Sequence, residues 1–290
     1  MHSAPVQAFP GPLSPEDMVR ELEQLPATPA VLPRLLGLLK SDSASLGEVI
    51  DLIRVEPSIT ARMIQMGSSA YYKHHGDRCE NVEEAVNRVG FNQVYKFVSY
   101  AATAHLLMHP LDSYGLTAED NWRLSVSCAL AADQLADHVG VDRSIAYTAG
   151  LFHGVGMVAI DTWRHRQRVN FHFDSTGLPD ETTDSERQAL GFTHASVGAA
   201  LLKHWDFPAG IVEPVCWQYQ PHESREEPLL TCLLYVAKWL RDAAHIPDEL
   251  PLPPAPDDWI LETLQIAPQG LETRLYQVRD AFHDTGKLLQ

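Results

Sequence analysis

Residues 148–160 read TAGLFHGVGMVAI, and the interpretation of the whole chain depends on this stretch. Its apolar residues predict a buried helix that carries a single imidazole, His153. Gly154 and Gly156 follow, and each can either end the helix or allow a neighbouring helix to approach very closely. A buried divalent cation would need a carboxylate beside the histidine, and glycine supplies none.

The rest of the chain has helical periodicity and helix-capping signals, and no run alternates convincingly like a strand. Capping residues stand before several apolar-periodic segments, and they are Ser14, Ser45, Asn81, Asn92, Thr117 and Asp142. The sequence therefore predicts an all-α fold, arranged as a two-lobed helical bundle.

The domain boundaries follow from proline content and from the order of the predicted helices. We expect residues 1–14 to be a mobile leader and 15–110 to form an N-terminal helical lobe. Residues 111–245 are expected to form a second lobe. The segment 246–290 contains PDELPLPPAPDD at 247–258, which predicts a proline-rich linker before a helical tail.

Composition limits the classes of partner. The chain has 38 acidic and 22 basic residues, a net charge of −16, so its average field repels nucleic-acid phosphates and anionic lipids. The four cysteines show no paired spacing, which argues against a disulfide framework and a zinc site. No apolar segment approaches the ~20 residues that span a bilayer, and no signal peptide is recognisable at Met1. We expect a cytoplasmic protein without direct contacts to nucleic acid or membrane.

Motifs of catalysis and nucleotide binding are missing from the sequence. It contains no GxSxG elbow, no GxxxxGK[ST] loop and no HExxH pair. Cys128 and Cys216 lie in apolar segments and are interpreted as core residues. A metal site remains an alternative only through an irregular set of side chains, which would comprise His153, His165, His172 and His194 with Asp161 or Asp174.

Several long segments, in order, resemble the HDOD domain, a non-catalytic relative of the HD metal-dependent phosphohydrolases found in bacterial signalling proteins. They are LPATPAVLPRLLGLLK (25–40), SLGEVIDLIRVEPSITARMIQMGSSAYY (45–72), VEEAVNRVGFNQVYKFV (82–98), TAGLFHGVGMVAI (148–160) and LGFTHASVGAALLKHWDFP (190–208). The resemblance covers residues 18 to 243 and implies an HD-like helical core in the second lobe.

The resemblance also implies which positions correspond to the metal ligands of the HD enzymes. The paired His-Asp becomes His153-Gly154, which keeps the imidazole and loses the carboxylate. The other corresponding positions hold Leu124, Gln218, Tyr219 and Lys238. An ammonium group at one of them would repel a cation, so the resemblance implies a degenerate, non-catalytic site without metal or cofactor. His153 is then expected to be satisfied by a hydrogen bond in the core.

The expected function is that of a regulatory output module of the response-regulator type, which acts through contacts with signalling or regulatory proteins. Self-association is left open. Candidate contact residues lie in the loop at 71–75 and in the basic run WRHRQR at 163–168, and comprise Tyr71, Tyr72, Lys73, Arg164, Arg166 and Arg168. The alternatives are a metal-dependent phosphohydrolase or phosphodiesterase that uses the irregular histidine set, and a small-ligand sensor that binds in the vacated pocket.

Overall fold

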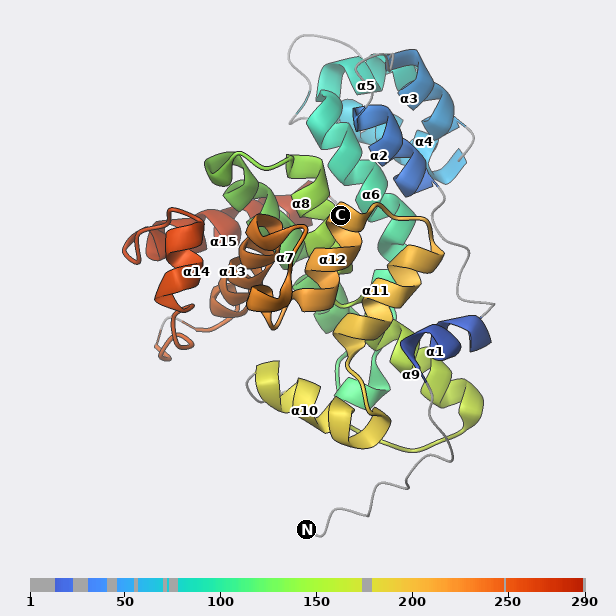
Figure 1. The fold of residues 1–290 in the computed structure, drawn as a ribbon. Coiled ribbons are helices and arrows are strands. Elements are labelled where there is room, and N and C mark those ends of the chain that lie inside the picture. Colours follow the sequence, from blue (N-terminus) through green and yellow to red (C-terminus); the bar gives the residue numbers. More distant parts are fainter. Residues whose placement is uncertain are drawn as a thin grey trace. The chain divides into compact units, whose positions relative to one another are not determined.

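Helices account for all regular secondary structure in the part of the chain that the computed structural model describes (Figure 1). The described residues are 14–22, 31–40, 46–54, 57–69, 72, 78–173, 179–247 and 249–288. Within these ranges the only β pairing is one isolated bridge between Leu111 and Leu116. The prediction of an all-α, two-lobed fold is confirmed. The same ranges contain no helix that is both long and apolar enough to cross a membrane.

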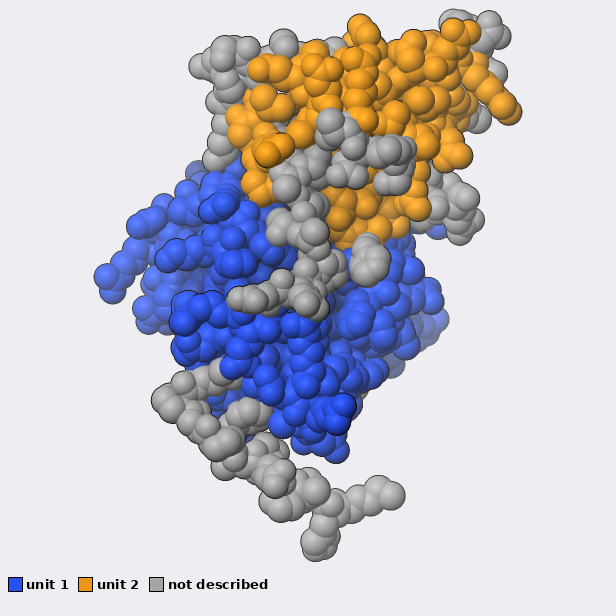
Figure 2. Space-filling view, turned by 90° about the vertical axis from the view of Figure 1, so that its right-hand side faces the viewer, with its two compact units in different colours: residues 1–26, 106–284 blue, residues 27–105, 285–290 orange. Residues whose placement is uncertain are grey.

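The chain divides into two compact units, coloured separately in Figure 2. Unit 2 comprises residues 27–105 and 285–290. Its helices are α2 (Val31–Lys40), α3 (Leu46–Arg54), α4 (Pro57–Gly67), α5 (Val82–Val89) and most of α6 (Phe91–Leu107). Asn81 caps α5 by accepting a hydrogen bond from the Glu84 backbone, as the sequence predicts.

Unit 1 comprises residues 1–26 and 106–284 and contains the TAGLFHGVGMVAI stretch. Its elements are α1 (Pro15–Glu21), η1 (Asp112–Tyr114), α7 (Ala118–Val139), α8 (Arg143–Phe152), α9 (Val155–Gln167), α10 (Pro179–Leu190), α11 (His194–His204), α12 (Ala209–Trp217), η2 (Pro221–Glu223), α13 (Pro228–Ala244), α14 (Asp258–Thr263) and α15 (Gly270–Leu288). The last residues of α15 fall in unit 2.

The core of unit 1 is built from helices with small residues at their contacts. Helix α7 packs against α8 and α13, and α11 packs against α9 and α12. A β-carbon at Gly150 of α8 would lie 2.7 Å from the Cys128 carbonyl oxygen of α7, so glycine lets the two backbones touch. Cys128 is fully buried, as expected for a core residue, and burial raises the pKa of its thiol to about 12.

Two boundaries differ from those predicted. Helix α1 was placed in the N-terminal lobe, but it packs on α9 and α11 of unit 1, where the Trp163 indole and the Gln167 amide donate to the Glu21 carboxylate at 2.7 and 2.9 Å. The tail is likewise part of unit 1 up to Asp284, because Leu271 and Val278 of α15 are buried there. Of the expected leader, residues 1–13 lie outside the described part, and Ser14 is the N-cap of α1.

Candidate functional site

The two glycines of the TAGLFHGVGMVAI stretch have different roles. Helix α8 ends at Phe152, and Gly154 stands at the break before α9. At Gly156 a β-carbon would lie 1.8 Å from the His194 carbonyl oxygen and 2.7 Å from the Gly198 nitrogen, so α9 and α11 meet backbone to backbone. At Gly154 a β-carbon would meet only the flexible end of Met157. The predicted helix end is therefore at Gly154, and the predicted close approach is at Gly156.

His153 is buried and has a hydrogen-bond partner on each ring nitrogen. Nδ1 lies 2.7 Å from the Gly150 carbonyl oxygen, and Nε2 contacts the Arg241 guanidinium. Because a guanidinium group has no lone pair, Nε2 must accept from Arg241 and Nδ1 must donate to Gly150. Burial lowers the pKa of the imidazole well below 6.5, and the positive charges of Arg241 and Lys238 lower it further. The ring is therefore neutral.

Two cationic side chains from α13 occupy this centre. Arg241 is 8% exposed, and its Nε and a terminal nitrogen donate to the Asp242 carboxylate at 2.8 and 2.9 Å. Lys238 is 4% exposed; its Nζ lies 3.3 Å from the Gln218 carbonyl oxygen and 3.0 Å from the centroid of the Tyr219 ring. The Asp242 carboxylate neutralises only one of these two positive charges, so the centre keeps a net positive charge.

Gln218 joins the end of α12 to the break between α8 and α9. Its side-chain amide donates to the carbonyl oxygens of His153 at 2.8 Å and Val215 at 3.0 Å. The structure thus brings together His153, Gly154, Gln218, Tyr219 and Lys238 from three separate parts of the sequence. Leu124 is half-buried on α7, and its aliphatic side chain offers neither a donor nor an acceptor to this network.

A second buried network adjoins the first through Tyr219. The Tyr219 hydroxyl lies 3.0 Å from His194 Nε2, and His194 Nδ1 lies 2.9 Å from the Glu186 carboxylate. The same carboxylate accepts from the Tyr114 hydroxyl at 2.6 Å and from the His194 backbone at 2.8 Å. Glu186 is fully buried, and these bonds fasten α10 to η1 and to the start of α11.

The residues of this centre do not fit a divalent cation. The only free lone pair of the His153 imidazole accepts a hydrogen bond from Arg241. The charged groups that act on the ring, Arg241 and Lys238, are both positive. Nowhere in the described ranges do three or more His, Cys, Asp or Glu side chains converge in a way that could hold a metal. A cation here would have to displace Arg241 and then face Lys238 without a carboxylate ligand.

The irregular histidine set of the alternative hypothesis is dispersed. His165 is half-exposed and lies 3.2 Å from Asp112 and 3.4 Å from Asp161, in a separate cluster where Ser113 also donates to Asp161. His172 is exposed beside Gly115. Asp174 lies outside the described residues.

The candidate contact residues are less available than expected. Tyr72, predicted in an exposed loop, is buried, and its neighbours Tyr71 and Lys73 lie outside the described part. The Arg164 side chain is only 14% exposed, and it faces Asp161 at 3.8 Å and Asp112 at 4.0 Å. Arg166 is exposed but donates to the Glu21 carbonyl oxygen, and Arg168 is exposed in a left-handed conformation that ends α9. The basic run thus serves in part to hold α1 and η1.

Sequence reasoning missed Arg241, Asp242 and Glu186. A signal was present for Arg241, because Lys238 and Arg241 stand three residues apart in the apolar run LLYVAKWLRDAA, on one face of a buried helix. Glu186 had no such signal, since it lies in a polar helix, PDETTDSERQAL, among other acidic residues such as the exposed Asp184.

Comparisons with solved structures show the same fold. The chain is similar to a candidate signal transduction protein from Marinobacter aquaeolei VT8, with a TM-score of 0.70 and 22% identity over 92% of this chain and 60% of that one. It is also similar to a candidate phosphohydrolase from Shewanella amazonensis SB2B, with a TM-score of 0.65 and 21% identity over 94% and 98% of the two chains. The expected HD-like helical core is confirmed.

Sequence comparisons identify the family. An uncharacterized protein of Treponema pallidum (strain Nichols) is 21% identical over 226 residues, which are 76% of this chain and 43% of that protein. The chain therefore spans less than two thirds of the Treponema and Marinobacter proteins. A family model described as "HDOD domain" matches residues 25–221. Because that match covers more than half of the chain, the protein belongs to the HDOD domain family.

Proposed function

We propose that the protein is a regulatory module of signal transduction, an output module of the response-regulator type, that acts in the cytoplasm by contacting other proteins. The family match and the likeness to the candidate signal transduction protein from Marinobacter aquaeolei support a signalling role. The net charge of −16 favours protein partners over nucleic acid or anionic lipid.

We further propose that the module does not cleave phosphoesters with a metal. The contact between Arg241 and His153 carries this proposal, because it uses the lone pair with which the imidazole would bind a cation. A metal-dependent hydrolase needs a bound ion that lowers the pKa of its water. At this centre the fixed positive charge comes from side chains, which cannot generate such a nucleophile. His153 and Arg241 are hydrogen-bonded within the protein, and Gln218 donates through its amide nitrogen. Among the described residues of this centre, only the Gln218 Oε1 atom is buried without a partner, so the centre offers a small ligand a single acceptor and does not favour the sensor.

The test is elemental analysis and phosphoesterase assays on protein purified without an affinity tag. We expect substoichiometric transition metal and no cleavage of bis(p-nitrophenyl) phosphate or cyclic dinucleotides with Mg²⁺, Mn²⁺ or Zn²⁺ added. His153→Ala and the exposed-site control His222→Ala should give the same background. A stoichiometric metal that is lost in His153→Ala, together with cleavage that this variant abolishes, would overturn the proposal.

A further inference from the structure

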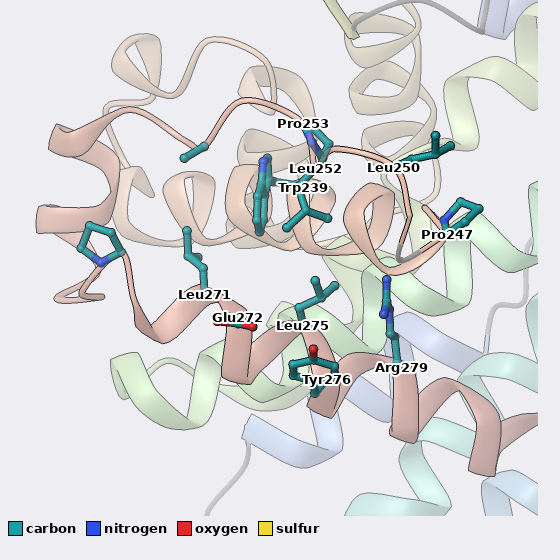
Figure 3. Close-up of a pocket in the computed structure, with 12 residues that line it drawn as sticks. Trp239, Pro247, Leu250, Leu252, Pro253, Leu271, Glu272, Leu275, Tyr276 and Arg279 are labelled. Atoms are coloured by element: carbon teal, nitrogen blue, oxygen red, sulfur yellow. The ribbon is translucent and has the colours of Figure 1, made fainter.

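An open groove lies on unit 1, away from the buried histidines. It runs between Trp239 of α13, residues 247 and 250–255, and the face of α15 that carries Leu271, Leu275 and Tyr276 (Figure 3). Its volume is ≈560 Å³, within the range of roughly 300–1,000 Å³ typical of binding pockets. We call it the α15 groove.

Exposed apolar side chains concentrate in the segment that forms this groove. Leu250, Leu252 and Tyr276 line it and are 57%, 45% and 55% exposed. Figure 3 shows Leu252 pointing between Trp239 and Leu275. Elsewhere in the described residues, the large apolar side chains with comparable exposure are Met108, Leu229 and Trp259. A cluster of this kind is typical of a surface that a partner covers.

The surroundings of the groove are acidic. Residues 247–280 carry seven acidic residues against two arginines, so this segment contributes −5 of the net charge of −16. Glu272 lines the groove, and Asp280 stands two turns further along α15, with Tyr276 between them at helical i, i+4 spacing. Both carboxylates are on exposed residues. The charged residues that line the groove itself are Glu272 and Arg279, and the wider segment around them is negatively charged.

Two of the side chains that line the groove already use N–H donors within the protein. The Trp239 indole N–H donates to the Pro254 carbonyl oxygen at 2.7 Å. Arg279 donates to the carbonyl oxygens of Ala243, Ala244 and Ile246 at the end of α13. An extended or proline-rich peptide would need such donors for its own carbonyl groups. A helix would not, because its backbone is hydrogen-bonded internally.

We propose that the α15 groove binds an amphipathic helix of a partner protein, with leucine-like residues on one face and lysine or arginine flanking it. The apolar anchors of the helix enter between Trp239, Leu252 and Leu275, and its basic residues face Glu272 and Asp280. This inference rests on the proposed function, since it names the surface and the class of partner through which the module acts.

The test uses the full chain and a fluorescently labelled peptide of about 18 residues that places leucines at i, i+3, i+4 and i+7 and lysines elsewhere. We expect saturable binding by fluorescence anisotropy that weakens as salt rises. Leu252→Ser and Glu272→Lys should each weaken binding about tenfold. The matched controls are Leu229→Ser, an exposed leucine outside the groove, and Glu119→Lys on α7; both should bind as the wild type does.

Three results would overturn the inference: a scrambled peptide of the same composition binds equally well, the groove variants bind like their controls, or a proline-rich peptide binds more tightly. Sedimentation must also be measured, because a dimer that Leu252→Ser dissociates would identify a second copy as the occupant. Metal-dependent phosphoester cleavage with intact peptide binding would refute the proposed function alone. Failure of peptide binding without cleavage would refute this inference alone.

Discussion

The centre around His153 and the α15 groove lie in the same unit but differ in burial and in charge. The centre is closed, positively charged and hydrogen-bonded within the protein. The groove is open and mostly apolar, and it lies in an acidic segment of the chain. This difference indicates that the side chains around His153 contribute to stability, whereas the groove has the features of a recognition surface. Substitutions in the two regions should therefore affect different measurements.

The largest effect on stability is expected for Arg241→Met. The substitution leaves Asp242 without its partner and His153 Nε2 without its donor, both close to buried apolar groups. Removing one member of a buried ion pair costs roughly 3–5 kcal/mol, and because Asp242 is one-third exposed we expect about 3 kcal/mol. Urea unfolding at pH 7.5 measures the change. Arg225→Met, at an exposed position, is the control and should change the free energy of unfolding by less than about 0.5 kcal/mol.

A smaller effect is expected from pH. His153 stays neutral in the folded protein because its pKa is held well below 6.5, but in the unfolded chain it binds a proton below about pH 6.5. The free energy of unfolding should therefore fall as pH decreases from 7.5, by at most about 1.4 kcal/mol per pH unit for this proton. His245 contributes in the same direction between pH 6.5 and 4, since burial and the Arg123 charge lower its pKa to about 4.

His153→Gln isolates the contribution of His153. The amide can still donate and accept but does not titrate, so the dependence of unfolding free energy on pH should become shallower between pH 7 and 5. His222→Gln, at an exposed site, should keep the wild-type dependence. Equal slopes for His153→Gln and the wild type would show that the pKa of the imidazole is the same in the folded and unfolded states, contrary to the structure.

The smallest effect on stability is expected in the groove. Leu252→Ser removes a side chain that is 45% exposed, so the free energy of unfolding should change by no more than about 0.5 kcal/mol while peptide binding weakens. Thermal unfolding followed by circular dichroism measures it. A loss above about 2 kcal/mol would mean that Leu252 is a core residue and that the comparison between the two regions does not hold.

Local sequence signals predicted the helices well. Ser14, Asn81, Thr117 and Asp142 are helix N-caps in the structure, because capping depends on a side chain and a backbone only two or three residues apart. Asn92, predicted as a further cap, instead lies inside α6, which begins at Phe91, and Ser45 lies outside the described residues. His153 was expected, from the family resemblance, to be satisfied by a hydrogen bond in the core. The structure shows one to the Gly150 carbonyl oxygen, a partner one turn away that the prediction did not name.

Interactions between distant residues were not predictable in this way. Arg241 and His153 are 88 residues apart, and only the packing of α13 beside the α8–α9 break brings them together. Lys238 was assigned to this position, but the cation that touches the imidazole lies three residues further along α13. The attachment of α1 to Trp163, 142 residues away, likewise has no local signal, which is why the predicted lobe boundary was misplaced.

The attachment of α1 has a consequence for biosynthesis. Helix α1 is among the first parts of unit 1 to leave the ribosome, yet its partners on α9 and α11 are translated more than a hundred residues later. All of residues 27–105 emerge in between, so unit 2 can fold while α1 is still waiting for its binding surface. Unit 1 is therefore completed only after α9 and α11 have been synthesised and can bind α1. A nascent chain stalled before α9 would leave α1 without its binding surface and accessible to chaperones and proteases.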